Sequence, residues 1–129
     1  MTRGLLLLAH GARDAAWALP FEEVARRIRV ARPGLALELA FLEFMAPDLL
    51  EAGRRLAEAG SLSVDVLPLF LGSGGHVRKD LPELLASLAT RHPAVRWRLR
   101  PAVGEADAVL AAMAAEALRL VPPAADAPR

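Results

Sequence analysis

The chain of 129 residues contains no cysteine, and this absence excludes several kinds of site. Without thiols there is no disulfide framework, no thiolate-bound metal and no iron–sulfur cluster. The absence is compatible with a cytoplasmic protein, which is the location we expect. Aromatic residues are also scarce, at 5%, whereas 54% of the residues are hydrophobic, so we expect a core that is mainly aliphatic and alanine-rich.

A large excess of charge of either sign is also missing. The formal net charge is +1, which gives no general electrostatic reason to expect nucleic acid or a membrane surface as a partner. The apolar run near the amino terminus, residues 4–9, is too short for a membrane span and lacks the cleavage pattern of a secretory signal. We therefore expect this run to be a buried strand.

Four apolar segments alternate with segments of helical periodicity. The apolar segments cover residues 4–9, 35–41, 62–67 and 95–99. Strands joined by helices form a parallel sheet with right-handed crossovers. We therefore expect an α/β fold of flavodoxin-like type, with a small doubly wound, four-stranded parallel sheet in the order 2-1-3-4. A single domain is expected over residues 1–121, followed by a disordered tail at residues 122–129.

Two helix starts are predicted from local signals. Asp80 and Glu83 have the spacing of a capping box, which predicts a third helix beginning near Asp80. Gly104 is expected to begin the fourth helix. The apolar side of this fourth helix is expected to face the core; it consists of Val109, Leu110, Met113, Ala117 and Leu118.

Polar side chains follow three strands that the predicted order places side by side. His10 follows the first strand, Glu43 the second and His76 the third, and successive residues of this set are 33 positions apart. The carboxyl ends of adjacent parallel strands lie about 5 Å apart and form the edge where such sheets bind ligands. Two imidazoles and a carboxylate at this edge suit a divalent first-row metal ion that is held with open positions.

Each of these features also has a simpler interpretation. A His-Gly pair after a strand is commonly a turn, a lone glutamate near a helix start is commonly solvated, and His92 before a proline is expected to be structural. The glycine-rich loop at residues 72–75 lacks the order of a phosphate-binding loop and the third glycine of a dinucleotide fingerprint. The stripe of Arg96, Arg98 and Arg100 could meet an anionic partner, but charge on an edge strand also prevents unwanted pairing.

Three segments together resemble the small sirohydrochlorin chelatases of cobalamin and sirohaem biosynthesis. They are Leu-Leu-Ala-His-Gly-Ala-Arg-Asp at 7–14, Phe-Leu-Glu at 41–43, and Pro-Leu-Phe-Leu-Gly-Ser-Gly-Gly-His-Val-Arg-Lys-Asp-Leu-Pro at 68–82. The resemblance covers roughly residues 4–120, and the third segment is the most specific. Ala12 stands where a serine is common in the family's motif.

The resemblance implies a reaction and a set of site residues. It implies insertion of Co²⁺ or Fe²⁺, with Ni²⁺ as a further possibility, into sirohydrochlorin without any cofactor beyond the substrate metal. It places the family's metal-binding and catalytic residues on His10, His76 and Glu43. It also implies a homodimer, because short members of the family pair while long members carry two such domains.

The residues around the proposed edge supply candidates for binding the tetrapyrrole. Cationic groups near the two histidine loops could draw a polycarboxylate to the site; they are Arg13, Arg78 and Lys79. The loop glycines Gly74 and Gly75 allow close approach. Apolar side chains that could pack on the flat macrocycle are Phe44, Leu69 and Phe70, with Trp17 and Met45 nearby. For each apolar residue, simple core or loop packing is an equally good interpretation.

Two other classes of function remain open on the sequence. One is a non-catalytic carrier of tetrapyrrole or metal that uses the same edge of the sheet. The other is a structural flavodoxin-like domain in which the histidines are incidental. Turnover distinguishes a chelatase from a carrier. Loss of ligand binding when a histidine is removed distinguishes a chelatase from a structural domain.

Overall fold

The computed structural model describes residues 2–72 and 74–124, apart from the side chain of His76. Most of the predicted tail, residues 125–129, lies outside these residues. Among the described residues, no helix has the length and apolar character needed to cross a membrane.

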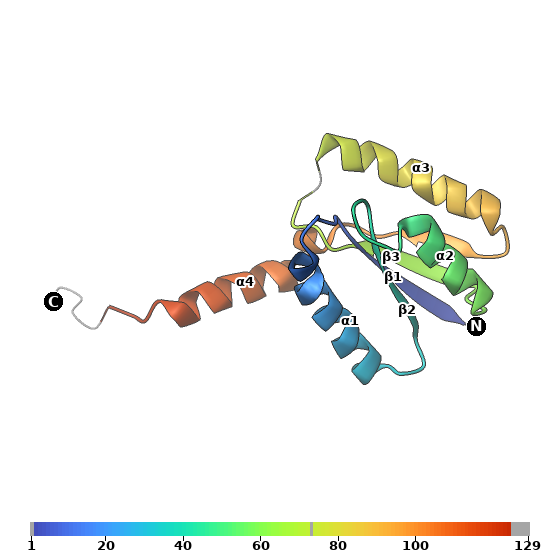
Figure 1. Cartoon of the computed structure of the whole chain (residues 1–129). Coiled ribbons are helices and arrows are strands. Elements are labelled where there is room, and N and C mark those ends of the chain that lie inside the picture. Colours follow the sequence, from blue (N-terminus) through green and yellow to red (C-terminus); the bar gives the residue numbers. More distant parts are fainter. Residues whose placement is uncertain (1, 73, 125–129) are drawn as a thin grey trace.

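A four-stranded parallel sheet forms the centre of the molecule (Figure 1). The strands are β1 (Arg3–Ala9), β2 (Ala36–Phe41), β3 (Ser63–Pro68) and β4 (Arg96–Leu99). Their order is β2-β1-β3-β4, which confirms the predicted topology with β1 central and β4 at an edge. The loops that follow β1, β2 and β3 therefore share one edge of the sheet.

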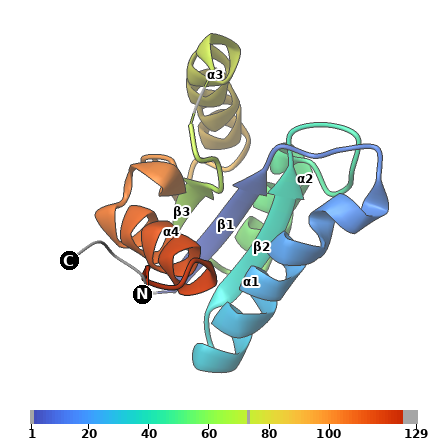
Figure 2. The same cartoon turned by 90° about the vertical axis from the view of Figure 1, so that its left-hand side faces the viewer.

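Helices cover the sheet unevenly. They are α1 (Leu19–Ala31), α2 (Leu49–Glu58), α3 (Gly75–Arg91) and α4 (Asp107–Leu120), with short 3-10 helices η1 (Ala15–Ala18) and η2 (Val103–Glu105). Figure 2 shows α2 and α3 on one side of the sheet and α1 on the other. The arrangement is that of a doubly wound sheet, in which both faces need helical cover.

The core follows from the alternation of side chains along the two central strands. Leu6, Leu8, Val64 and Val66 are buried and pack toward α2 and α3, while Leu7 packs in a second cluster toward α1. The continuous apolar run in β1 thus serves both faces, as expected for a central parallel strand.

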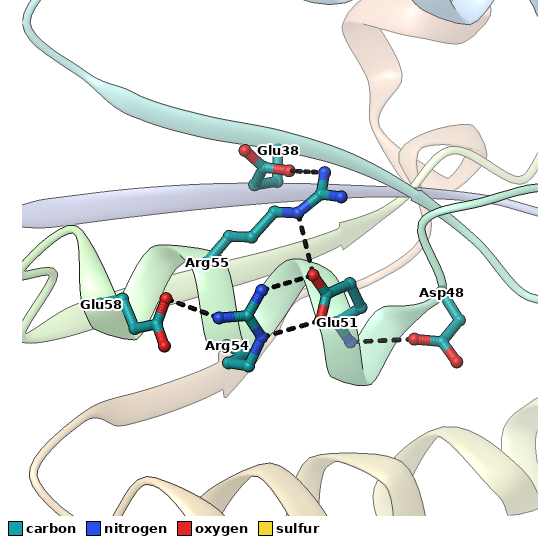
Figure 3. A network of polar contacts seen from close by, with 6 residues as sticks. All are labelled: Glu38, Asp48, Glu51, Arg54, Arg55 and Glu58. Atoms are coloured by element: carbon teal, nitrogen blue, oxygen red, sulfur yellow. Dashed lines mark hydrogen bonds and ion pairs between the residues drawn. The ribbon is translucent and has the colours of Figure 1, made fainter.

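The start and the outer surface of α2 are fixed by polar contacts (Figure 3). The Asp48 carboxylate accepts a hydrogen bond from the Glu51 backbone N–H at 2.9 Å, which caps the helix. Arg55 donates to Glu51 and to Glu38 of β2, each at 3.2 Å, while Arg54 pairs with Glu51. The network ties α2 to β2, the strand that leads to Glu43.

The predicted start of α3 is wrong. The helix begins at Gly75 after a Gly74 N-cap, five residues before Asp80, so Asp80 lies inside the helix and does not cap it. The Arg78 N–H donates to the Gly74 carbonyl at 3.1 Å, which closes a helical turn before Pro82. Proline is favoured in a first turn but is also found inside α3, where the missing N–H leaves one gap in the hydrogen-bond ladder.

The predicted inward face of α4 is also wrong. Gly104 lies in η2, and α4 begins at Asp107. None of its residues is buried, and Leu110 and Met113 are 50% and 48% exposed. Because η2 redirects the chain, α4 extends beyond the body of the domain instead of folding back over the sheet (Figure 1).

Candidate functional site

The loops after β1 and β2 are held together by their backbones at the carboxyl edge of the sheet. The Leu42 N–H donates to the Ala9 carbonyl at 3.0 Å, and the Glu43 N–H donates to the His10 carbonyl at 3.2 Å. Gly11 has φ +99°, and a Cβ there would lie 1.9 Å from the Glu43 carbonyl oxygen. Only glycine fits this close approach, so the His-Gly pair brings the two loops into contact.

This approach brings two of the predicted site residues together. The His10 Nε2 lies 3.2 Å from the Glu43 Oε1, and the two side chains are 52% and 51% exposed. The Phe70 ring packs against His10 with centroids 6.0 Å apart and planes at 64°. His10 is therefore supported from the core side while its polar edge stays open to solvent.

A hollow of about 420 Å³ opens beside this pair. It is lined by His10, Leu42, Glu43, Val77, Asp80, Leu81 and Leu84. The hollow thus lies between the His10 and Glu43 loops and the amino-terminal half of α3. A site at this position has one wall from two loops and another from a helix that starts in glycines.

Asp80 borders the candidate site, whereas the sequence predicted that it caps a helix. It lines the hollow that His10 and Glu43 also line. A signal for it was present, because positions 76 and 80 are four apart and share one side of a helix. The capping interpretation hid this signal by placing the helix start too late.

His76 is the second residue of α3, and its backbone starts the helix that borders the hollow. The described residues contain no group of three or more histidine, aspartate or glutamate side chains that could hold a metal ion. A three-ligand site of His10, Glu43 and His76 therefore stays a prediction, of which the structure places the first two ligands together.

The predicted substrate-binding residues divide into exposed and buried groups. The Arg13 guanidinium lies 4.9 Å from the centroid of the Phe44 ring, and Phe44 is 58% exposed with φ 65°. Gly74, Gly75, Arg78 and Lys79 are exposed at the start of α3.

The remaining candidates lie deeper. Phe70 is only 8% exposed, and Leu69 is half-buried against the core. Trp17 and Met45 pack on a cluster of Ala9, Ala18 and Phe41. These four residues support the loops from beneath, whereas Phe44 offers an open apolar surface.

The chain was compared with known proteins. A model of the CbiX family matches residues 4–120. A sirohydrochlorin cobaltochelatase of Sulfolobus acidocaldarius is 30% identical over 88 residues, which cover 68% of this chain and 70% of that relative.

Solved structures give the same fold. A CbiX protein from Marinobacter aquaeolei VT8 has a TM-score of 0.79 and 31% identity, covering 89% of this chain and 93% of its own. The sirohydrochlorin chelatase SirB from Bacillus subtilis subspecies spizizenii, in complex with cobalt, has a TM-score of 0.79 at 23% identity. That match covers 91% of this chain but 50% of SirB, so this chain spans half the length of SirB and the likeness concerns the fold alone.

Proposed function

Since this chain belongs to the CbiX family, we propose that it is a chelatase that inserts a divalent metal ion into sirohydrochlorin. The metal is a substrate, Co²⁺ or Fe²⁺ with Ni²⁺ as a further possibility, and the product enters cobalamin or sirohaem biosynthesis. The observation that carries the proposal is the contact of His10 Nε2 with Glu43 Oε1 at an open edge of the sheet. The name of the Sulfolobus relative supports the substrate.

The separation of these two atoms suits a shared metal ion. Imidazole nitrogen and carboxylate oxygen each bind first-row divalent ions at about 2.1 Å. With the two atoms 3.2 Å apart, the nitrogen–metal–oxygen angle would be roughly 100°, between the octahedral and tetrahedral values. The pair can therefore take up a metal with little rearrangement, and His76 would supply a third ligand from α3.

Metallation also requires that two pyrrole protons leave the macrocycle. A neutral imidazole nitrogen can bind metal or accept a proton, but one nitrogen cannot do both at once. The transfer of metal from His10 and Glu43 to the macrocycle frees these two groups at the moment when the protons must be accepted. We therefore propose that His10 and Glu43 first deliver the metal and then accept the protons, with His76 acting beside them.

Charge around the hollow is expected to guide the substrate. Sirohydrochlorin is a polycarboxylate, and Arg78 and Lys79 are exposed in the first turns of α3. Arg13 stands over the Phe44 ring in the loops that follow β1 and β2, so a cation and an aromatic face are presented together. Exposed cations raise the local concentration of an anionic ligand without fixing its orientation.

We further propose that the working form is a homodimer. One small sheet offers a narrow edge, whereas ligand sites bury most of the ligand's surface. A two-fold pair would place two copies of the His10 and Glu43 edge across one cleft, so that the second copy covers the side of the macrocycle that the first leaves open.

The test is an anaerobic incubation of the protein with sirohydrochlorin and each metal ion, followed by the absorption spectrum. His10→Ala and Glu43→Gln are expected to lower the rate at least about 100-fold, in the range for loss of a positioned acid–base group. His92→Ala is the matched control, since His92 lies at the far end of α3 beside Trp97. Wild-type rates in the two site variants would remove these residues from the mechanism.

A further inference from the structure

The loop that links β3 to α3 leads the chain to His76, and its first residues contact the segment that follows β4. The Gly104 N–H in η2 donates to the Phe70 carbonyl at 2.9 Å. Gly104 is buried in this contact, although Leu71, the residue after Phe70, is exposed. The two segments are therefore joined backbone to backbone at the carboxyl edge of the sheet.

The contact leaves no room for a side chain at position 104. A Cβ there would lie 2.0 Å from the Leu71 carbonyl oxygen, and the Leu71 Cα would also lie in its way. These are backbone atoms, so no side-chain rotation could clear the space. The φ of Gly104 lies outside the left-handed region, which an alanine could adopt without strain. Glycine is thus required here by the close approach alone.

Few other contacts hold the loop among the described residues. The Leu69 N–H donates to the Leu8 carbonyl at 2.8 Å, which fixes the point where the chain leaves the sheet. In the described part of the chain, the bond from Gly104 is the last backbone hydrogen bond from another segment before α3 begins. At Gly72 and Gly74 a Cβ would meet nothing within 4 Å, so neighbouring groups do not confine the backbone there. The course of the loop therefore depends strongly on Gly104.

Both sides of the contact are anchored in the core. Ala102, two residues before Gly104, is buried in the main core cluster. Phe70 is buried in the same cluster, and its ring also packs against His10. Because interiors are close-packed, neither side can move away without disturbing buried groups. The contact is thus a fixed point from which the loop starts toward His76.

We infer that Gly104 is a positioning residue for metal binding, because its contact with Phe70 and Leu71 fixes the loop that leads to His76. The inference rests on the proposed function, in which His76 is the third metal ligand. The residues that line the hollow beside His10 do not include Gly104. Gly104 therefore acts only through the loop. Groups that orient a metal ligand from outside the site affect metal affinity nearly as strongly as the ligands themselves.

The first test is a double-mutant cycle on the binding of Co²⁺ alone, measured by calorimetry. Gly104→Ala is expected to weaken Co²⁺ binding about 10- to 100-fold, the range for loss of a group that orients a metal ligand. In the His76→Ala background the same substitution should have no further effect, because the ligand that it misplaces is absent. Gly72→Ala is the matched control, since it adds a Cβ to the same loop where that atom meets nothing within 4 Å. This control should bind Co²⁺ as wild type does.

The possible failures of this test are distinguishable. Equal losses of affinity in the two backgrounds would show that Gly104→Ala acts on the whole fold, and this would overturn the inference. An unchanged affinity in Gly104→Ala would overturn it as well. If His76→Ala binds Co²⁺ as tightly as wild type, the proposed metal site fails, and the positioning role of Gly104 fails with it.

The second test needs no substitution of Gly104. Hydrogen–deuterium exchange of the peptides that contain Gly104 is measured by mass spectrometry with and without Co²⁺. Because coupling between two sites is reciprocal, a metal ion held by His76 should stabilise the Gly104 contact and slow exchange there about 5-fold or more. The Gly60 N–H, which donates to the Ala57 carbonyl after α2, is the internal control. The slowing should disappear in His76→Ala, and exchange at Gly104 that Co²⁺ leaves unchanged in wild type would overturn the inference.

Discussion

Replacing Gly11 with alanine should separate the two loops that carry His10 and Glu43. The Cβ of an alanine would lie 1.9 Å from the Glu43 carbonyl oxygen, whereas ordinary contact begins at 3.4 Å. The obstacle is backbone on both sides, so no side chain can rotate away. The loops must move apart by roughly 1 to 1.5 Å, which is enough to break the 3.2 Å hydrogen bond from the Glu43 N–H to the His10 carbonyl.

Two costs contribute to the expected loss of stability. A left-handed φ costs a residue with a Cβ about 1–2 kcal/mol, and relieving the overlap adds about 1–3 kcal/mol. The free energy of unfolding should thus fall by about 2–5 kcal/mol. A displacement of about 1 Å at a reacting group can lower a rate about 100-fold, so activity should fall even where the protein stays folded.

Gly60→Ala provides the control. Gly60 has φ +94°, but a Cβ there has no atom within 4 Å, so this variant carries the conformational cost alone. Urea unfolding at one protein concentration should show a loss of about 1–2 kcal/mol for Gly60→Ala, with activity retained. The reasoning is refuted if Gly11→Ala loses no more stability than Gly60→Ala and metallates sirohydrochlorin at the wild-type rate.

Two further predictions concern charge. Replacing Arg78 and Lys79 together by alanine should raise the apparent KM for sirohydrochlorin. The wild-type KM should itself rise with salt, because salt screens exposed charges. A wild-type KM that is independent of salt would contradict this steering role. Hydrogen bonds from Arg54 and then Arg55 lower the pKa of Glu51 from 4.5 to about 2. The Glu51 carboxylate therefore stabilises the fold above pH 4.5, and this contribution is lost as the pH falls toward 2. Glu51→Gln should accordingly lose less stability than wild type over that interval, and equal losses in urea titrations would count against the network.

The features that the sequence predicted well are those with a strong local pattern. The apolar run before His10 and the apolar segment before the glycine loop each agree with the structure. The sheet order followed from the alternation of strands with helices, which requires right-handed crossovers in a parallel sheet. Because the order was right, His10 and Glu43 were expected to meet, and they do.

The errors arose where two local rules compete or where periodicity does not show what covers an apolar face. Asp80 and Pro82 resemble the start of a helix, but the turn closed by the Arg78 N–H extends α3 back to Gly75. The apolar side of α4 was expected to face the core of its own chain, because periodicity shows that a face needs cover without showing what covers it. The left-handed Phe44 backbone, which turns the loop after Glu43, had no signal in the sequence.

The most direct test of the proposed activity is the number of metal ions inserted per protein chain. Protein, with sirohydrochlorin and Co²⁺ in large excess, should yield many metallated molecules per chain under anaerobic conditions, measured by the change in absorption after subtraction of the uncatalysed rate. His10→Ala should reduce this yield to the uncatalysed level over the same time. A wild-type yield that stops at one molecule per site would contradict catalysis and identify a carrier of tetrapyrrole or metal.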